Sequence, residues 1–108
     1  MKLGGIYLED TDIYNNDSVY ILPIKKVKNV CFGIRLITNV HTNQEINNTL
    51  RKKLRLYSNN SFWQLQEELL IQYNQGYIGI LEDDIFQDLE EKCEKAKKYQ
   101  MYVKGEKL

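Results

Sequence analysis

Apolar and polar positions alternate along the first 40 residues in segments of strand length. The alternation predicts strands over residues 4–9 and 18–24, separated by a run of turn-forming residues. The second segment is rich in β-branched and aromatic residues and contains Pro23, the one proline of the chain. Because proline has no N–H to donate to a strand ladder, we expect Pro23 at the end of its strand or on an edge.

Residues 30–40 have the strongest strand pattern in the chain, and Gly33 within them is a candidate for a β-bulge. Successive side chains of a strand point to opposite faces of the sheet. Arg35 therefore falls on one face of this strand, and Thr38 falls on the other.

The middle of the chain is harder to interpret. Residues 41–60 are polar, and we expect a loop of roughly ten residues, then a strand or short helix around residues 54–57. Residues 61–73 fit helical spacing, with Ser61 as a plausible N-cap, and they also fit the period of two that strands have. The local pattern favours the helix.

The clearest helix follows residues 82–84, which are three consecutive acids at the positive N-terminal end of the predicted helix. Glu82 or Asp83 is the expected N-cap, and capping accounts for the acids better than a divalent metal ion does. Residues 100–108 are expected to form a flexible tail. The apolar stripe of the helix predicted after residues 82–84 consists of Ile85, Leu89, Cys93 and Ala96.

Composition indicates one globular domain spanning residues 1–108, with 43% hydrophobic and 28% charged residues. Strands followed by a helix predict the α+β class, mainly β. The chain has neither a signal-peptide pattern nor the roughly 20 apolar residues of a membrane span, so we expect a cytoplasmic protein. Cys31 and Cys93 lack motif spacing and are expected to be reduced core thiols rather than a disulfide.

Equal totals of acids and bases hide a segregation of charge. Residues 25–55 contain eight bases and one acid, whereas residues 67–94 contain nine acids and one base. One interpretation is a basic face that meets phosphates and an acidic face turned away from them. The other is a pair of surfaces that attract each other or a second subunit.

Few residues are available for catalysis or for binding a cofactor. His41 is the one histidine, and the two cysteines are not paired in a motif. We therefore predict neither a zinc site nor a Ser-His-Asp triad, and no cofactor and no metal. His41 could act as a general base, although a solvated loop histidine is the favoured interpretation.

A set of hydrogen-bond donors directed at phosphate is the strongest chemical signal. Such a set suits cleavage of RNA by its own 2′-hydroxyl, because the protein then stabilises charge on the phosphorane and moves a proton without a metal. We expect the set at one end of the strand over residues 30–40 and in the preceding turn. Its members are Arg35, Thr38 and His41, with Lys25, Lys26 and Lys28, and the three lysines and His41 are the candidate RNA-binding residues.

The order of these segments resembles the PemK/MazF-like family of toxins from toxin–antitoxin systems. Residues 5–7 are similar to the family's opening strand, and residues 18–24 to the strand after its Arg-Pro pair. Leu-Ile-Thr-Asn at residues 36–39 resembles the I-T-S motif that ends a central strand. Residues 61–65 and 78–91 are similar to the closing section and the C-terminal helix.

The resemblance implies a small SH3-like β-barrel with a C-terminal helix, so we expect either that barrel or a curled antiparallel sheet. It also implies a strand at residues 61–65. As an activity it implies a metal-independent endoribonuclease that cuts single-stranded RNA as a homodimer and is neutralised by an antitoxin protein.

The family's catalytic arginine has no counterpart at its usual place, where this chain has Asp17-Ser18 instead of Arg-Pro. The resemblance implies that Thr38 supplies the catalytic hydroxyl. Either Arg35 or a lysine of residues 25–28 then replaces the arginine, or the activity has been lost. The alternative hypothesis is a non-enzymatic interaction or inhibitor protein of a phage or mobile element, acting through its charge-segregated surface.

Overall fold

The computed structural model describes residues 1–12 and 15–105, and one antiparallel sheet lies at their centre, with strand order β4-β3-β2-β1-β5. The two edge strands do not pair with each other in this part of the chain, so the sheet is open. The structure confirms the α+β class and has the antiparallel sheet rather than the closed barrel. The strands are β1 (Gly5–Asp12), β2 (Asp17–Val27), β3 (Val30–Thr38), β4 (Trp63–Gln66) and β5 (Tyr77–Ile80).

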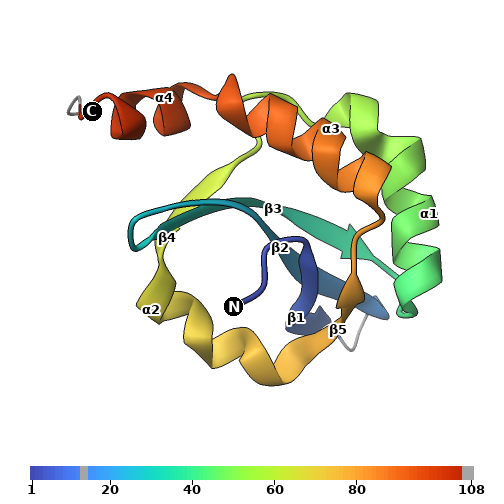
Figure 1. Cartoon of the computed structure of the whole chain (residues 1–108). Coiled ribbons are helices and arrows are strands. Elements are labelled where there is room, and N and C mark those ends of the chain that lie inside the picture. Colours follow the sequence, from blue (N-terminus) through green and yellow to red (C-terminus); the bar gives the residue numbers. More distant parts are fainter. Residues whose placement is uncertain (13–14, 106–108) are drawn as a thin grey trace.

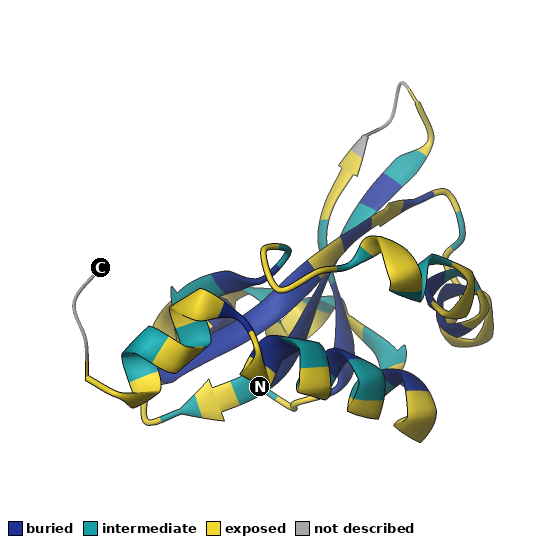
Figure 2. Cartoon of the chain, turned by 90° about the horizontal axis from the view of Figure 1, so that it is seen from above, coloured by how far each residue is buried: buried dark blue, intermediate teal, exposed yellow. Residues whose placement is uncertain are grey.

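Helices cover both faces of the sheet. The described residues form α1 (Asn43–Lys53), α2 (Glu67–Leu70), α3 (Asp83–Glu94) and α4 (Lys97–Val103), with 3₁₀-helices η1 (Leu54–Leu56) and η2 (Ile71–Gly76). Figure 1 shows α1, α3 and α4 over one face, which we call the inner face, and α2 with η2 over the opposite, outer face. Figure 2 shows the end of β1 and the start of β2 extending past the helices.

The main hydrophobic core lies between the inner face and its helices. In β3, Phe32 and Ile34 are fully buried on the inner face, whereas Arg35 is exposed and Ile37 is 61% exposed on the outer face. The predicted alternation is confirmed from Ile34 to Thr38, whereas Cys31 on the outer face is buried as well. The alternation places the large apolar side chains where α1 and α3 cover them.

The predicted apolar stripe of α3 is also confirmed, since Ile85, Leu89 and Cys93 are fully buried. The acids at its start have a different role from the one expected. Glu82 is the N-cap residue but its side chain makes no capping hydrogen bond. Glu82 and Asp84 instead form ion pairs with Arg51 of α1.

The helix α1 stands where a loop was predicted, so that prediction is wrong. Thr42 is its N-cap, because the hydroxyl accepts a hydrogen bond from the Glu45 N–H at 3.2 Å and donates one to the Glu45 carboxylate at 2.7 Å. Thr-x-x-Glu is the sequence signature of a capping box. Ile46 and Leu50, one turn apart, bury the apolar side of this helix.

Two asparagines of α1 hold the open edge of β5. The buried Asn47 amide donates to the Ile80 carbonyl at 3.0 Å and accepts from the Glu82 N–H at 2.8 Å. The side-chain amide oxygen Oδ1 of Asn43 accepts from the Ile80 N–H at 2.9 Å. A side chain at position 79 would collide with Asn43, which explains Gly79 in this strand. The asparagines satisfy backbone groups that an edge strand otherwise leaves unpaired.

The expectations for Pro23 and Gly33 were wrong. Pro23 lies within the central strand β2, at a register shift between Pro23 and Lys25. A bulge is one of the places where a sheet accommodates proline, because the ladder is interrupted there. Gly33 lies opposite Pro23 and is not itself the bulge; a side chain there would collide with the ring of Trp63.

Residues 61–73 contain both of the structures that their pattern allowed. Trp63–Gln66 forms β4 and pairs with β3, so the favoured helix is wrong for these residues. Helical structure begins at Glu67 and continues through α2 into η2. The strand overlaps the segment in which the family resemblance implied one.

The cysteines are free and buried, as predicted. Burial raises the pKa of the Cys93 thiol to about 12, so the thiol stays protonated at neutral pH. The predicted tail begins within α4, and residues 106–108 lie outside the described residues. Among the helices of the described ranges, none is long and apolar enough to cross a membrane.

Candidate functional site

Arg35, a candidate catalytic residue, is engaged in a bidentate ion pair on the outer face. Its Nε and Nη2 donate to the Glu9 carboxylate at 2.8 and 3.0 Å. The Tyr73 hydroxyl of η2 donates to the same carboxylate at 3.4 Å. The hydrogen bond from Arg35 holds the pKa of Glu9 below its ordinary value of 4.5, so the carboxylate is charged at neutral pH. The arrangement joins β1, β3 and η2.

Thr38, the candidate catalytic hydroxyl, lies on the inner face and is 8% exposed. Its hydroxyl accepts a hydrogen bond from the Val40 N–H at 3.2 Å. His41 lies at the same end of the sheet, where its Nδ1 is 2.9 Å from the Tyr20 hydroxyl. Thr38 and His41 therefore lie at one end of the inner face, while Arg35 projects from the other face.

The lysines of residues 25–28 lie at the turn of the β2–β3 hairpin, and Thr38 lies at the opposite end of that hairpin. Val27 pairs with Val30 beside the turn, whereas Ser18 pairs with Thr38 at the opposite end. The strand β3 has nine residues from one end to the other, a length of about 26 Å at about 3.3 Å per residue step. The compact set of donors that we predicted is therefore not formed.

Two of these lysines also form ion pairs with glutamates. The Lys25 ammonium donates to Glu94 at 2.8 Å, and the Lys26 ammonium donates to Glu67 at 2.9 Å. Together with the pairs between Arg51 and the start of α3, they join the basic segment 25–55 to the acidic segment 67–94. The charge segregation of the sequence thus serves, in part, to attach these two segments to each other.

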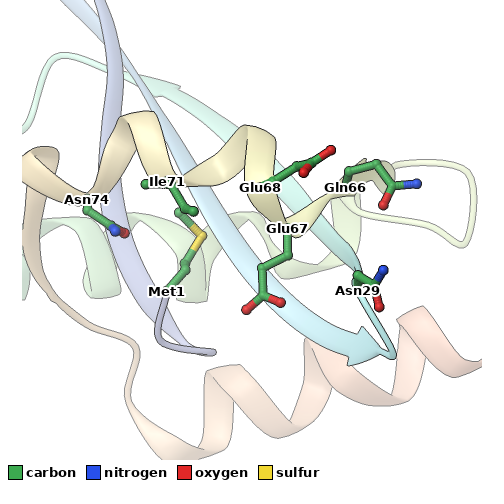
Figure 3. Close-up of a pocket in the computed structure, with 7 residues that line it drawn as sticks. All are labelled: Met1, Asn29, Gln66, Glu67, Glu68, Ile71 and Asn74. Atoms are coloured by element: carbon green, nitrogen blue, oxygen red, sulfur yellow. The ribbon is translucent and has the colours of Figure 1, made fainter.

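A cavity of about 480 Å³ opens beside α2 on the outer face (Figure 3). We call it the outer cavity. Figure 3 shows Glu67 pointing between Met1 and Asn29, and the sulfur-bearing side chain of Met1 reaching toward Ile71. The lining residues are Met1, Asn29, Gln66, Glu67, Glu68, Ile71 and Asn74.

The lining of the outer cavity combines hydrogen-bond acceptors with an apolar wall. Three amide side chains and two carboxylates supply the acceptors, and Glu67 has a single ion-pair partner, Lys26, among the described residues. Ile71 is 59% exposed at the cavity, and Leu69 on the same helical segment is 50% exposed. Large apolar side chains that stay exposed next to a polar cavity are typical of a binding surface.

Sequence reasoning missed this surface, although a signal was present. Residues 69–71 are Leu-Leu-Ile, three consecutive apolar residues. One side of a short helix cannot bury all three, and here Leu70 alone is buried. The two apolar residues in excess of one buried stripe, Leu69 and Ile71, stay exposed, and Ile71 lines the outer cavity.

Comparison of the chain with protein-family models, with curated proteins and with solved structures finds no match. The resemblance to the PemK/MazF-like toxins therefore stays a prediction, as do the catalytic roles that it implies for Thr38 and Arg35.

Proposed function

We propose that this chain is a protein-binding module without catalytic activity, which receives a basic and apolar segment of a partner protein at the outer cavity. The proposal rests on one observation, the exposed Ile71 side chain at the rim of a cavity lined with amides and carboxylates. It corresponds to the interaction or inhibitor protein that the sequence allowed as its alternative.

The chemistry of the outer cavity determines the kind of segment that it suits. Apolar contact with Ile71 would remove exposed apolar area from water, which drives most protein association. The carboxylate and amide oxygens would accept hydrogen bonds from a lysine or arginine side chain of the partner, since such charge-assisted bonds are the strong ones. An interface of this kind has an apolar anchor with polar groups beside it.

The competing hypothesis is the ribonuclease, and the geometry favours it less. An endoribonuclease needs its proton-transfer group and its charge-stabilising group within reach of the same phosphate. Thr38 and Arg35 project from opposite faces of the sheet, and Arg35 is held by Glu9. A homodimer would bring residues of two copies together. Cleavage of single-stranded RNA is therefore to be measured at several protein concentrations.

Selection from a library of displayed random peptides tests the proposal. We expect enrichment of peptides that combine a lysine or arginine with apolar residues. Calorimetry should then detect binding of the enriched peptide to the protein. Ile71→Lys should weaken that binding at least tenfold, because it places a charge at the apolar rim. Leu56→Lys is the matched control, since Leu56 is 66% exposed on η1, away from the outer cavity.

Two results would contradict the proposal. One is a library that yields no enriched peptide, or a peptide that binds the Ile71→Lys variant as tightly as the wild type. The other is cleavage of single-stranded RNA by the wild-type protein that the Thr38→Ala variant lacks, which would establish the ribonuclease instead.

A further inference from the structure

A second cavity, of about 430 Å³, lies between the β2–β3 turn and the end of α4. We call it the turn pocket. It and the outer cavity flank the same turn, because Lys28 lines the turn pocket and Asn29 lines the outer cavity. The lining residues of the turn pocket are Val27, Lys28, Tyr102, Val103, Lys104 and Gly105.

The turn pocket has two lysines whose ammonium groups differ from those of Lys25 and Lys26 in the same hairpin. Lys25 and Lys26 are bound to glutamates, whereas neither Lys28 nor Lys104 forms an ion pair within the described residues. The neighbouring segment, residues 95–108, contains five lysines and one acid, Glu106. An anion in the turn pocket would therefore meet two ammonium groups that have no ion-pair partner among residues 1–12 and 15–105.

The backbone of Lys28 gives a second, independent indication. Its φ is 56°, in the left-handed region where glycine or asparagine is normally found. A lysine there is strained, and strained residues cluster where a side chain has a function. The turn would form more easily with glycine at position 28, so its local geometry gives no reason for a lysine there.

The walls of the turn pocket indicate the rest of the ligand. Val27 and Val103 are apolar, and Tyr102 is held with its ring tilted against Phe32, at 5.9 Å between ring centroids. The volume falls in the range of small-molecule sites, which is about 300–1,000 Å³. Cations beside apolar and aromatic walls suit an anionic group attached to a planar or apolar body.

We propose that the turn pocket binds a phosphomonoester with an apolar or aromatic body, such as a nucleoside monophosphate. Lys28 and Lys104 neutralise the phosphate dianion, and Val27, Val103 and Tyr102 contact the organic part. This site is independent of the outer cavity and of the protein-binding function proposed for it.

Calorimetry at constant ionic strength, with adenosine 5′-monophosphate as the probe, tests this site. We expect saturable binding, at least tenfold tighter than that of inorganic phosphate, and no binding of adenosine. Lys28→Gly should weaken binding at least tenfold while the melting temperature stays the same or rises, because glycine removes the cation and relieves the backbone strain together. Lys104→Gln should weaken binding to a similar degree.

Lys52→Gln is the matched control, because Lys52 is an exposed lysine on α1 outside the turn pocket. It should leave the affinity within twofold of the wild type. The proposal is overturned if the monophosphate does not bind, if Lys28→Gly retains the wild-type affinity, or if Lys52→Gln lowers it equally. Equal affinity for inorganic phosphate would contradict the role of the apolar walls.

Discussion

The two faces of the sheet differ in what covers them and in what they leave exposed. Among the described residues, the inner face and its helices bury one large cluster of sixteen, all of them apolar or aromatic. The outer face buries five, and the ion pair between Glu9 and Arg35 lies on it as well. Those five residues are Tyr7, Ile21, Cys31, Trp63 and Leu70.

The difference indicates a division of roles between the faces. Burial of apolar area is the main stabilising contribution to a fold, so most of the stability should come from the inner face. The outer face is covered by one turn of α-helix and a 3₁₀-helix, and its exposed apolar residues add little to the fold. Side chains that are not needed for stability are available for binding.

The largest expected effect is on the free energy of unfolding when a fully buried leucine is truncated. Each face has such a leucine in its buried cluster, Leu89 on the inner face and Leu70 on the outer face. Leu89→Ala should lower the free energy of unfolding by about 3 to 5 kcal/mol, because the densely packed inner core cannot close the cavity. Leu70→Ala should cost about 2 kcal/mol or less, because the thin outer layer can move inward. Urea denaturation measures both, and equal losses would contradict the division of roles.

A smaller loss is expected where α1 holds the edge of β5. Asn47→Ala removes the partners of the Ile80 carbonyl and the Glu82 N–H and should cost about 1 to 3 kcal/mol. The neighbouring Asn48 is exposed, so Asn48→Ala should change stability by about 0.5 kcal/mol or less. If both variants unfold at the same urea concentration, the asparagine contacts do not stabilise the fold.

The smallest stability effect concerns Glu9 on the outer face and depends on pH. Its pKa is lowered in the folded protein, so the charged form stabilises the fold above pH 4.5 and that contribution is lost as the pH falls through the lowered pKa. Glu9→Gln should therefore cost about 1 kcal/mol or less at pH 7, because Arg35 is half exposed.

Unfolding curves for this variant and the wild type at a series of pH values provide the check. The two stabilities should converge in the acid range, below pH 4.5. A difference between them that stays constant from pH 7 to pH 3 would show that the charge of Glu9 contributes nothing.

Much of the fold could be predicted from the sequence because some segments have one dominant period. The first three strands and α3 alternate or repeat clearly in sequence. Burial follows the period in α3 and in the second half of β3, whereas residues 20–24 and 30–34 are buried throughout because both faces of the sheet are covered there. The helix α1 was missed because its residues are mostly polar, with few apolar residues to show a helical period. Its capping box, Thr42 to Glu45, was the available signal.

The candidate site was predicted less well, for reasons of register. Arg35 and Thr38 are three residues apart, and an odd separation within a strand puts two side chains on opposite faces. A tight turn after Val27 puts the lysines at the far end of the hairpin from Thr38. Closeness in sequence was taken as closeness in space. The outer cavity joins the β2–β3 turn to α2, and no local pattern links two segments so far apart.

A map of amide chemical shifts during titration with the selected peptide tests the central claim most directly. The account predicts that the largest shifts fall on the residues of the outer cavity, Ile71 among them. The amides of α1 and α3 should stay unchanged. Largest shifts on those inner helices, or around Thr38 and His41, would contradict a binding role for the outer face.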